Sequence, residues 1–183
     1  DRVEEEVKYS IILADPPWTY RDKCHSGERG AGYKYKLMSE AELQLMRPFI
    51  DSIAADDCLL AMWWVPPQPA EALRLVEAWG FKFKTMSGFT WRKLTKNGNE
   101  HFGMGNWSRA NAESCLFATR GKPKRVSAGV RSMVNAPVRE HSRKPDEVRE
   151  RLVQLMGDVR RIELFARQRV PGWDAWGLEV ETT

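Results

Sequence analysis

The hydrophobic positions of this chain fall into short unbroken runs, separated by stretches where they recur every three or four residues. The unbroken runs have the length and composition of buried strands and occupy residues 9–14, 58–65, 113–119 and 161–166. Residues 81–93 are also predicted to be extended, because aromatic residues alternate in their first half. Helical spacing predicts helices at residues 39–53, 69–79 and 145–156. Buried strands alternating with amphipathic helices predict an α/β fold, a layered sheet with helices on both faces.

The predicted helix boundaries rest on capping signals. Ser39 and Glu42 match the capping box that opens a helix. Pro69 suits the first turn of the next helix, and Gly80 suits its end. The stretch 120–144 shows weak strand character at most, so no element is assigned to it.

Length and composition limit the class of protein. The 183 residues predict one domain spanning 1–183, and 42% hydrophobic with 30% charged residues is typical of soluble globular proteins. No apolar run approaches the roughly 20 residues that cross a membrane, and the acidic start of the chain is no signal peptide. Three scattered cysteines form no metal-ligand spacing, so no metal is expected. They favour a reducing compartment. We expect a cytoplasmic, nucleoid-associated protein if the source is bacterial or phage, and a nuclear one if it is eukaryotic.

The net charge of +4 is mild, but the basic residues are unevenly distributed. Between Arg120 and Lys144 lie eight lysines and arginines against one glutamate, and the loop 19–38 adds further basic residues. Such clustering suits a polyanion, such as nucleic acid, better than a neutral metabolite. The loops 19–38 and 93–112 are too long for simple connectors and are predicted to be substrate or lid loops.

The most informative residues are Asp15-Pro16-Pro17-Trp18, directly after the first buried strand. Proline cannot donate to a sheet ladder and a buried carboxylate needs a partner, so the group is a poor structural element. Two prolines stiffen a turn, so that a carboxylate and a backbone carbonyl point the same way beside a flat ring. Such a group can hold a planar base by stacking while two acceptors take both hydrogens of its exocyclic amine. The alternative is a strand exit in which Asp15 caps a turn and Trp18 belongs to the core.

Further segments accompany this motif along the chain. They are WSRANAE at 107–113, HSRKP at 141–145, ELFAR at 163–167 and GWDAWG at 172–177. Together with the first motif they resemble the MT-A family, the adenine-N6 methyltransferases that include the catalytic subunit of the eukaryotic mRNA adenosine methyltransferase. The similarity extends from about Ile12 to Glu179. The motif order resembles β-class amino-methyltransferases, in which the catalytic motif precedes the cofactor-binding motifs.

The resemblance implies a Rossmann-like methyltransferase sheet, S-adenosylmethionine as methyl donor, and adenine in DNA or RNA as acceptor. It implies a catalytic motif of Asp15, Pro16, Pro17 and Trp18, in which Asp15 and the Pro16 carbonyl hold the amine and Trp18 flanks the base. The implied cofactor contacts are Asp15, Pro17, Lys144, Phe165, Arg167 and Glu179. Among these, Lys144 would meet the methionine carboxylate, and Phe165 and Arg167 would touch the adenosine part. Substrate contacts are predicted for Tyr35, Trp64, Lys93, Trp107 and Arg109.

Two departures from the family pattern concern the cofactor. Leu178 stands where the family often has an asparagine at the ribose, and the chain starts only fourteen residues before Asp15, where an acidic residue for the cofactor's adenine is expected upstream. A catalytically silent nucleic-acid-binding subunit is therefore the alternative to an enzyme. Methylation of a free nucleotide or a protein amide also stays open. We favour DNA over RNA because the chain is compact, and a homodimer and a heterodimer both remain open.

Overall fold

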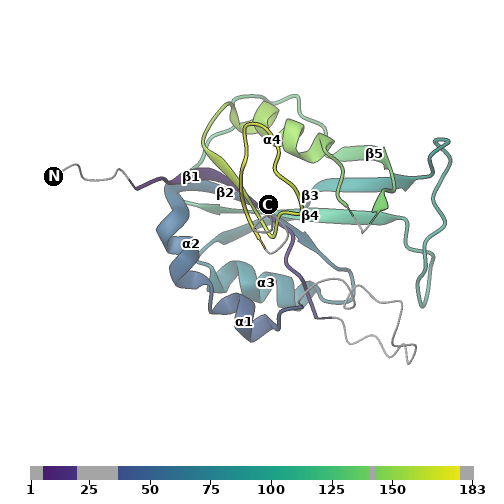
Figure 1. Cartoon of the computed structure of the whole chain (residues 1–183), viewed down its shortest axis with the longest axis horizontal. Coiled ribbons are helices and arrows are strands. Elements are labelled where there is room, and N and C mark those ends of the chain that lie inside the picture. The colour runs from purple at the N-terminus through teal and green to yellow at the C-terminus, as the bar shows by residue number, and fades with distance from the viewer. Residues whose placement is uncertain (1–5, 20–36, 141–142, 178–183) are drawn as a thin grey trace.

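In the computed structural model of the chain, which describes residues 6–19, 37–140 and 143–177, seven strands form one mixed sheet (Figure 1). Across the sheet the strands lie in the order β5-β3-β4-β2-β1-β6-β7. The strands are β1 (Tyr9–Ala14), β2 (Ala54–Trp64), β3 (Lys82–Leu94), β4 (Ala112–Arg120), β5 (Met133–Pro137), β6 (Arg161–Leu164) and β7 (Asp174–Trp176). The helices are α1 (Glu40–Gln44), α2 (Arg47–Ile53), α3 (Pro69–Ala78) and α4 (Glu147–Met156).

Strand β1 lies inside the sheet and pairs in parallel with both β2 and β6. It is buried almost throughout, as expected for a parallel strand covered on both faces. Strand β4 pairs antiparallel with β2 and β3, whereas β5 and β7 add parallel edges to β3 and β6. The carboxyl ends of β1, β2 and β6 therefore meet at one edge of the sheet, where a ligand site is expected.

Helices cover both faces of the sheet, as the sequence predicted. On one face α1, α2 and α3 pack Leu43, Ile50 and Leu75 into one hydrophobic cluster. On the other face α4 contributes Val148 and Leu152 to a second cluster. Figure 1 shows this asymmetry, with α4 above the sheet and the other three helices below it. None of the described helices is long and apolar enough to cross a membrane.

The predicted single helix at 39–53 is wrong. The capping box is present, since Ser39 Oγ accepts from the Glu42 amide and the Ser39 amide donates to the Glu42 carboxylate, both at 3.2 Å. The helix then ends at Gln44, and a second one begins at Arg47 with Pro48 in its first turn. Proline has no amide hydrogen and its ring clashes with the preceding turn, so it starts a helix more readily than it continues one.

The predicted strands all form, β1 over the predicted residues and the others with shifted ends, and two further strands were missed. Strand β6 stops at Leu164 rather than residue 166, because Phe165 adopts a left-handed backbone conformation with φ of 58°. Strand β5 lies within the stretch to which no element was assigned, and its residues alternate between exposed and buried. The three-residue strand β7 is also an edge strand. Such short edges carry little sequence signal, because their pairing depends on the neighbouring strand rather than on their own composition.

Candidate active site

Asp15 lies directly after β1, at the edge where the parallel strands end. Ala14 is in register with Leu164 of β6, and the Asp15 amide donates to the Leu164 carbonyl at 3.5 Å. The Asp15 side chain is 25% exposed, so it is accessible from the edge of the sheet. The Pro16 carbonyl accepts a hydrogen bond from the Trp18 amide at 2.8 Å. Since a carbonyl oxygen has two lone pairs, this bond occupies only one of those on Pro16.

Trp18 lies in the core below this turn. It is only 6% exposed, packs into the hydrophobic cluster on the α1–α3 face, and directs its indole N–H at the Trp63 carbonyl, 3.4 Å away. Trp18 therefore lies in the core, as in the alternative that the sequence left open. Little of the ring is open to a stacked base, so its contact with substrate stays a prediction.

Four charged side chains from distant parts of the sequence meet at this edge, and we call them the charged cluster: Asp15, Glu113, Lys93 and Lys144. The Lys144 ammonium lies 3.4 Å from both the Asp15 Oδ2 and the Glu113 Oε1 atoms. Glu113 also reaches the Lys93 ammonium, 3.0 Å from its Oε2 atom. The Lys144 ammonium sits over the ring of Trp63, 5.4 Å from its centre. Positive and negative groups therefore alternate along the cluster.

Burial and ion pairing act against each other in the charged cluster. Burial would raise the pKa of Glu113, but Lys144 and Lys93 outweigh it and lower the pKa below its ordinary value. Burial would lower the pKa of Lys144, but Asp15 and Glu113 more than compensate and raise it, against an opposing effect of nearby Arg167. Glu113 and Lys144 are thus both held in their charged forms. Glu113 lies within the WSRANAE segment, but no role was predicted for it, because its partners Lys93 and Lys144 lie far away along the chain.

The backbone of Lys144 is held by a second set of ion pairs behind the charged cluster. Arg139 donates to the Lys144 carbonyl at 2.5 Å and to both carboxylate oxygens of Asp146. Arg149 of α4, which is buried, joins Asp146 to Glu163 of β6. We call these four residues, Arg139, Asp146, Arg149 and Glu163, the support network. It connects the segment that carries Lys144 to the strand that leads into Phe165.

Phe165 forms the turn that follows β6. Its ring lies edge-on to Trp176, with 5.4 Å between ring centres, and Trp176 in turn contacts Phe49. Gly177 is required beside this turn, because a side chain there would approach the Phe165 backbone to 2.9 Å. Arg167 follows two residues later and lies close enough to Lys144 to act on its pKa. Phe165 and Arg167 are therefore at the same edge as Asp15, whereas their contact with a cofactor stays a prediction.

The remaining predicted site residues are placed differently from one another. Lys93 joins the charged cluster, whereas Trp107 and Arg109 lie on the exposed loop between β3 and β4. Trp64 packs beside the α1–α3 cluster and donates its indole N–H to the Met86 carbonyl at 2.8 Å. Tyr35, Glu179 and Leu178 lie outside the described residues, as does most of the loop 19–38.

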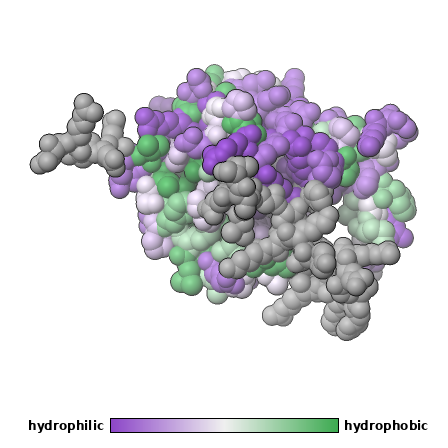
Figure 2. Space-filling model, in the orientation of Figure 1, coloured by the Kyte–Doolittle hydropathy of each residue, from purple (hydrophilic) through white to green (hydrophobic). Residues whose placement is uncertain are grey.

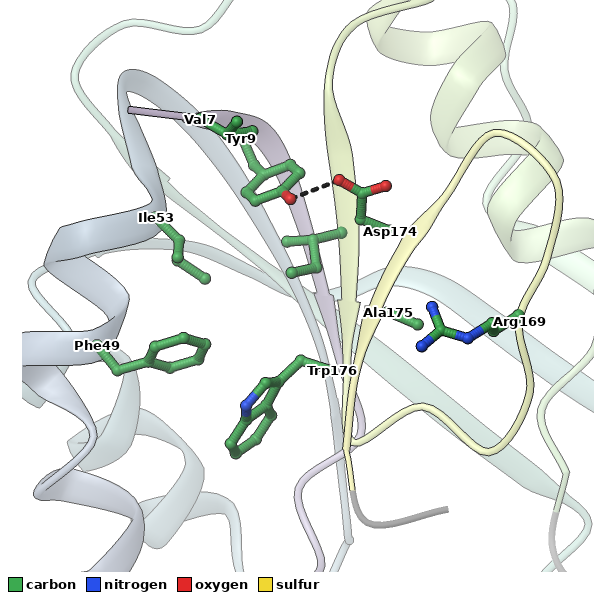
Figure 3. Close-up of a pocket in the computed structure, with 9 residues that line it drawn as sticks. Val7, Tyr9, Phe49, Ile53, Arg169, Asp174, Ala175 and Trp176 are labelled. Atoms are coloured by element: carbon green, nitrogen blue, oxygen red, sulfur yellow. Dashed lines mark hydrogen bonds between the residues drawn. The ribbon is translucent and has the colours of Figure 1, made fainter. Parts of the chain in front are cut away.

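A pocket of about 410 Å³ lies between α2 and the outer strands (Figure 3). Phe49 and Trp176 line it, and the Tyr9 hydroxyl donates to Asp174 at its rim, 2.5 Å away. None of its lining residues belongs to the charged cluster. The charged side chains of the cluster therefore lie at the strand ends and not in this pocket.

Comparison with known proteins shows to which family the chain belongs. The model of the MT-A70 family matches residues 9–179, which is nearly the whole chain. The chain belongs to the MT-A70 family. It is 35% identical to the type II methyltransferase M.MunI of Mycoplasma sp, over 94% of this chain and 78% of that protein. It is 28% identical to an MT-A70-like N(6)-adenosine-methyltransferase of Arabidopsis thaliana and 24% identical to the human catalytic subunit METTL3.

The resemblance seen in the sequence is thereby confirmed, and the chain is an adenine-N6 methyltransferase of this family. Members of the family use S-adenosylmethionine as methyl donor. The chain spans only about a quarter of the plant and human relatives, whose similarity covers 24% and 28% of their lengths. The two adenosine methyltransferases therefore share one segment with this chain, whereas the similarity to M.MunI covers most of that protein.

Proposed function

We propose that this MT-A70 protein methylates the N6 amine of adenine in DNA, with Asp15 and the Pro16 carbonyl as the groups that hold the amine. The observation that carries the proposal is the meeting of Asp15, Lys144 and Arg167 at the carboxyl ends of β1 and β6. This is the edge at which open α/β sheets bind their ligands. The mixed sheet and the motif order also suit the Rossmann-like, β-class arrangement that the sequence predicted.

The adenine amine needs such an arrangement because its lone pair is delocalised into the ring. Two acceptors on its hydrogens favour a pyramidal nitrogen, which frees the lone pair. Asp15 supplies a carboxylate, and Pro16 keeps a lone pair on its carbonyl beside it. The carboxylate also offsets the positive charge that grows on the amine during transfer, and the surplus proton leaves afterwards. Holding two reactants in line can contribute about 7–11 kcal/mol.

The described residues also fit the methyl donor. When bound, S-adenosylmethionine supplies an electrophilic methyl group, and it carries a carboxylate, an ammonium and an adenosine. Lys144 is the cation that would hold the carboxylate, and Arg167 would touch the adenosine part, since both lie at the strand ends. The half-buried ring of Phe165 would contact the flat adenosine, beside the close turn at Gly177. Lys144 would then exchange part of its pairing with Asp15 for the cofactor, which leaves Asp15 available for the amine.

DNA is the proposed substrate because the similarity to the type II methyltransferase is both higher and more complete than that to the adenosine methyltransferases. Type II methyltransferases modify DNA. In a duplex the target adenine must leave the stack, which costs a few kcal/mol, whereas a single strand avoids most of this cost.

The test is methyl transfer from labelled donor to single- and double-stranded DNA and RNA of matched sequence, followed by identification of the modified base. We expect N6-methyladenine in DNA. Asp15→Asn should lower the rate about 100- to 1000-fold, as removal of a preorganised polar group does elsewhere, while calorimetric binding of the donor persists. Asp56→Asn is the matched control, because Asp56 is exposed near the opposite end of β2. Methylation of RNA alone would refute the DNA proposal, and full activity of Asp15→Asn would refute its role.

A further inference from the structure

The loop between β3 and β4, residues 95–111, forms a thin ribbon that projects at the right of Figure 1. Its base is braced by backbone bonds, from the Lys93 amide to the Asn111 carbonyl and from the His101 amide to the Lys93 carbonyl. The Asn111 side chain donates to the Glu100 carboxylate at 2.9 Å, and Arg92 lies 3.7 Å from the same group. The ribbon is therefore structured at its base rather than an open loop.

The two sides of the ribbon touch through glycine. A Cβ atom on Gly103 would lie 1.7 Å from the Ala110 carbonyl oxygen, and one on Gly105 would lie 2.1 Å from that of Ser108. Both distances are impossible for a real side chain, so the backbones approach as closely as backbones can. No interior is left between them in which a large side chain could be buried.

Three large apolar side chains of the ribbon consequently face solvent. Phe102 is 74% exposed, Met104 is 83% exposed and Trp107 is fully exposed. In the described part of the chain, no other stretch of six residues carries three exposed large apolar side chains. Figure 2 shows hydrophobic atoms at the right edge of the molecule, where the ribbon lies, flanked by hydrophilic ones. A cluster of this kind marks a contact with a partner.

The charges around the ribbon indicate what the partner is. The Arg109 guanidinium lies over the ring of Phe102, 5.2 Å from its centre, and Lys96 is exposed nearby in the sequence. The acidic Glu100 is already engaged by Arg92 and Asn111. The base of the ribbon carries Lys93 and Glu113, two members of the charged cluster. Aromatic faces among cations, beside a site for a nucleobase, match the chemistry that binds unstacked bases.

We propose that the tip of this ribbon, Phe102, Met104 and Trp107, stacks on DNA bases that flank the target adenine. The proposal rests on the proposed function and adds to it a second contact, made with bases and not only with phosphates. Stacking explains why large apolar side chains are exposed to solvent although this lowers solubility. The DNA buries them on binding. The close backbone contact keeps the ribbon thin, so that it can enter between bases or into a groove.

The test is the affinity of the full chain for a fluorescein-labelled DNA oligonucleotide, measured by anisotropy at several salt concentrations. Trp107→Ala should weaken binding roughly 5- to 150-fold, the range for loss of one stacked base. The slope of log K against log salt should stay unchanged, because no phosphate contact is lost. Trp107→Phe should restore most of the affinity and Trp107→Leu should not, since stacking needs an aromatic face. Leu45→Ala is the control, an exposed apolar residue far from the ribbon in sequence.

The outcomes separate the two proposals. If the wild-type chain neither binds nor methylates any DNA, the proposed function fails. If it does both and Trp107→Ala binds as tightly as wild type, the stacking proposal fails while the function stands. Equal affinities of the Phe and Leu variants, or a changed salt slope, would also overturn stacking. A wild-type dimer that Trp107→Ala converts into a monomer in sedimentation would show that the tip binds protein instead.

Discussion

Replacement of Glu113 by glutamine tests the charged cluster most directly. The wild-type carboxylate lies 3.4 Å from the Lys144 ammonium and 3.0 Å from that of Lys93, with all three side chains largely buried. Glutamine keeps the shape but removes the charge, which leaves the largely buried Lys93 and Lys144 without the carboxylate between them, although Lys144 keeps its pair with Asp15. The variant should therefore lose stability well beyond what loss of one surface ion pair would cause.

The magnitude follows from the burial of the cluster. Two unit charges about 4 Å apart attract by about 4 kcal/mol at the effective dielectric constant of protein sites. Removing one partner of a buried pair costs about 3–5 kcal/mol. Because Glu113 is partly exposed, we expect the loss of stability in Glu113→Gln to lie near the lower end of this range. For a domain of this size, about 3 kcal/mol lowers the melting temperature by roughly 6–12 °C. The chain should still fold, because domains are stable by about 5–15 kcal/mol.

The loss is measured by thermal unfolding of Glu113→Gln, with Glu40→Gln as the control that removes an exposed ion pair. Glu40 pairs with Arg74 at 2.6 Å, but Arg74 is exposed, so the charge of Glu40 should contribute much less to stability than that of Glu113. The double variant Glu113→Gln/Lys93→Met should regain part of the lost stability, because it removes a cation left without its carboxylate. Equal melting temperatures of Glu113→Gln and Glu40→Gln would refute the reasoning, and so would strict additivity in the double variant.

The pH dependence of stability, compared between wild type and Glu113→Gln, gives an independent check. The pKa of Glu113 is lowered in the folded chain, because the two lysines outweigh burial. Its contribution to stability is therefore fully present above the ordinary glutamate pKa of about 4.3. That contribution is lost as the pH falls through the lower folded value. The stability difference between wild type and Glu113→Gln should be constant near neutrality and shrink below about pH 4.

Three further predictions concern other parts of the molecule. Lys144→Ala should weaken calorimetric binding of S-adenosylmethionine about tenfold or more, through loss of a charge-assisted contact; unchanged binding would remove Lys144 from the cofactor site. Arg139→Lys should raise the KM for the donor more than it lowers kcat, because lysine cannot bridge the Lys144 carbonyl and Asp146 together; an equal effect on both constants would contradict a positioning role. Burial and the bond to Asp174 raise the pKa of Tyr9 to about 12, so its protonation stabilises the fold below pH 10 and this contribution is lost toward pH 12. Ultraviolet titration should therefore show a late phenol step that Tyr9→Phe lacks.

Local patterns in the sequence were sufficient to predict the elements whose structure depends mainly on neighbouring residues. The apolar runs predicted β1, β2, β4 and β6 because parallel or central strands are buried on both faces and need no alternation. The capping box at Ser39 formed as predicted, whereas Pro48 ended the predicted helix in a way that the chain itself could have indicated. The order of the motifs was sufficient to identify the family, since the matched residues 9–179 contain all the quoted segments.

Only the tertiary structure decided which side chains act together. Glu113 and Lys144 are 31 positions apart, and they meet because β4 pairs antiparallel beside β2 while the segment before α4 returns to the same edge. Likewise, Arg149 of α4 pairs with Asp146 at helical spacing, but its second pair, with Glu163 of β6, exists only because α4 packs on the sheet. Strand order and register set such contacts, and both depend on the packing of all strands at once. The sequence by itself determined the chemistry that the chain carries, whereas the sheet determined where that chemistry is brought together.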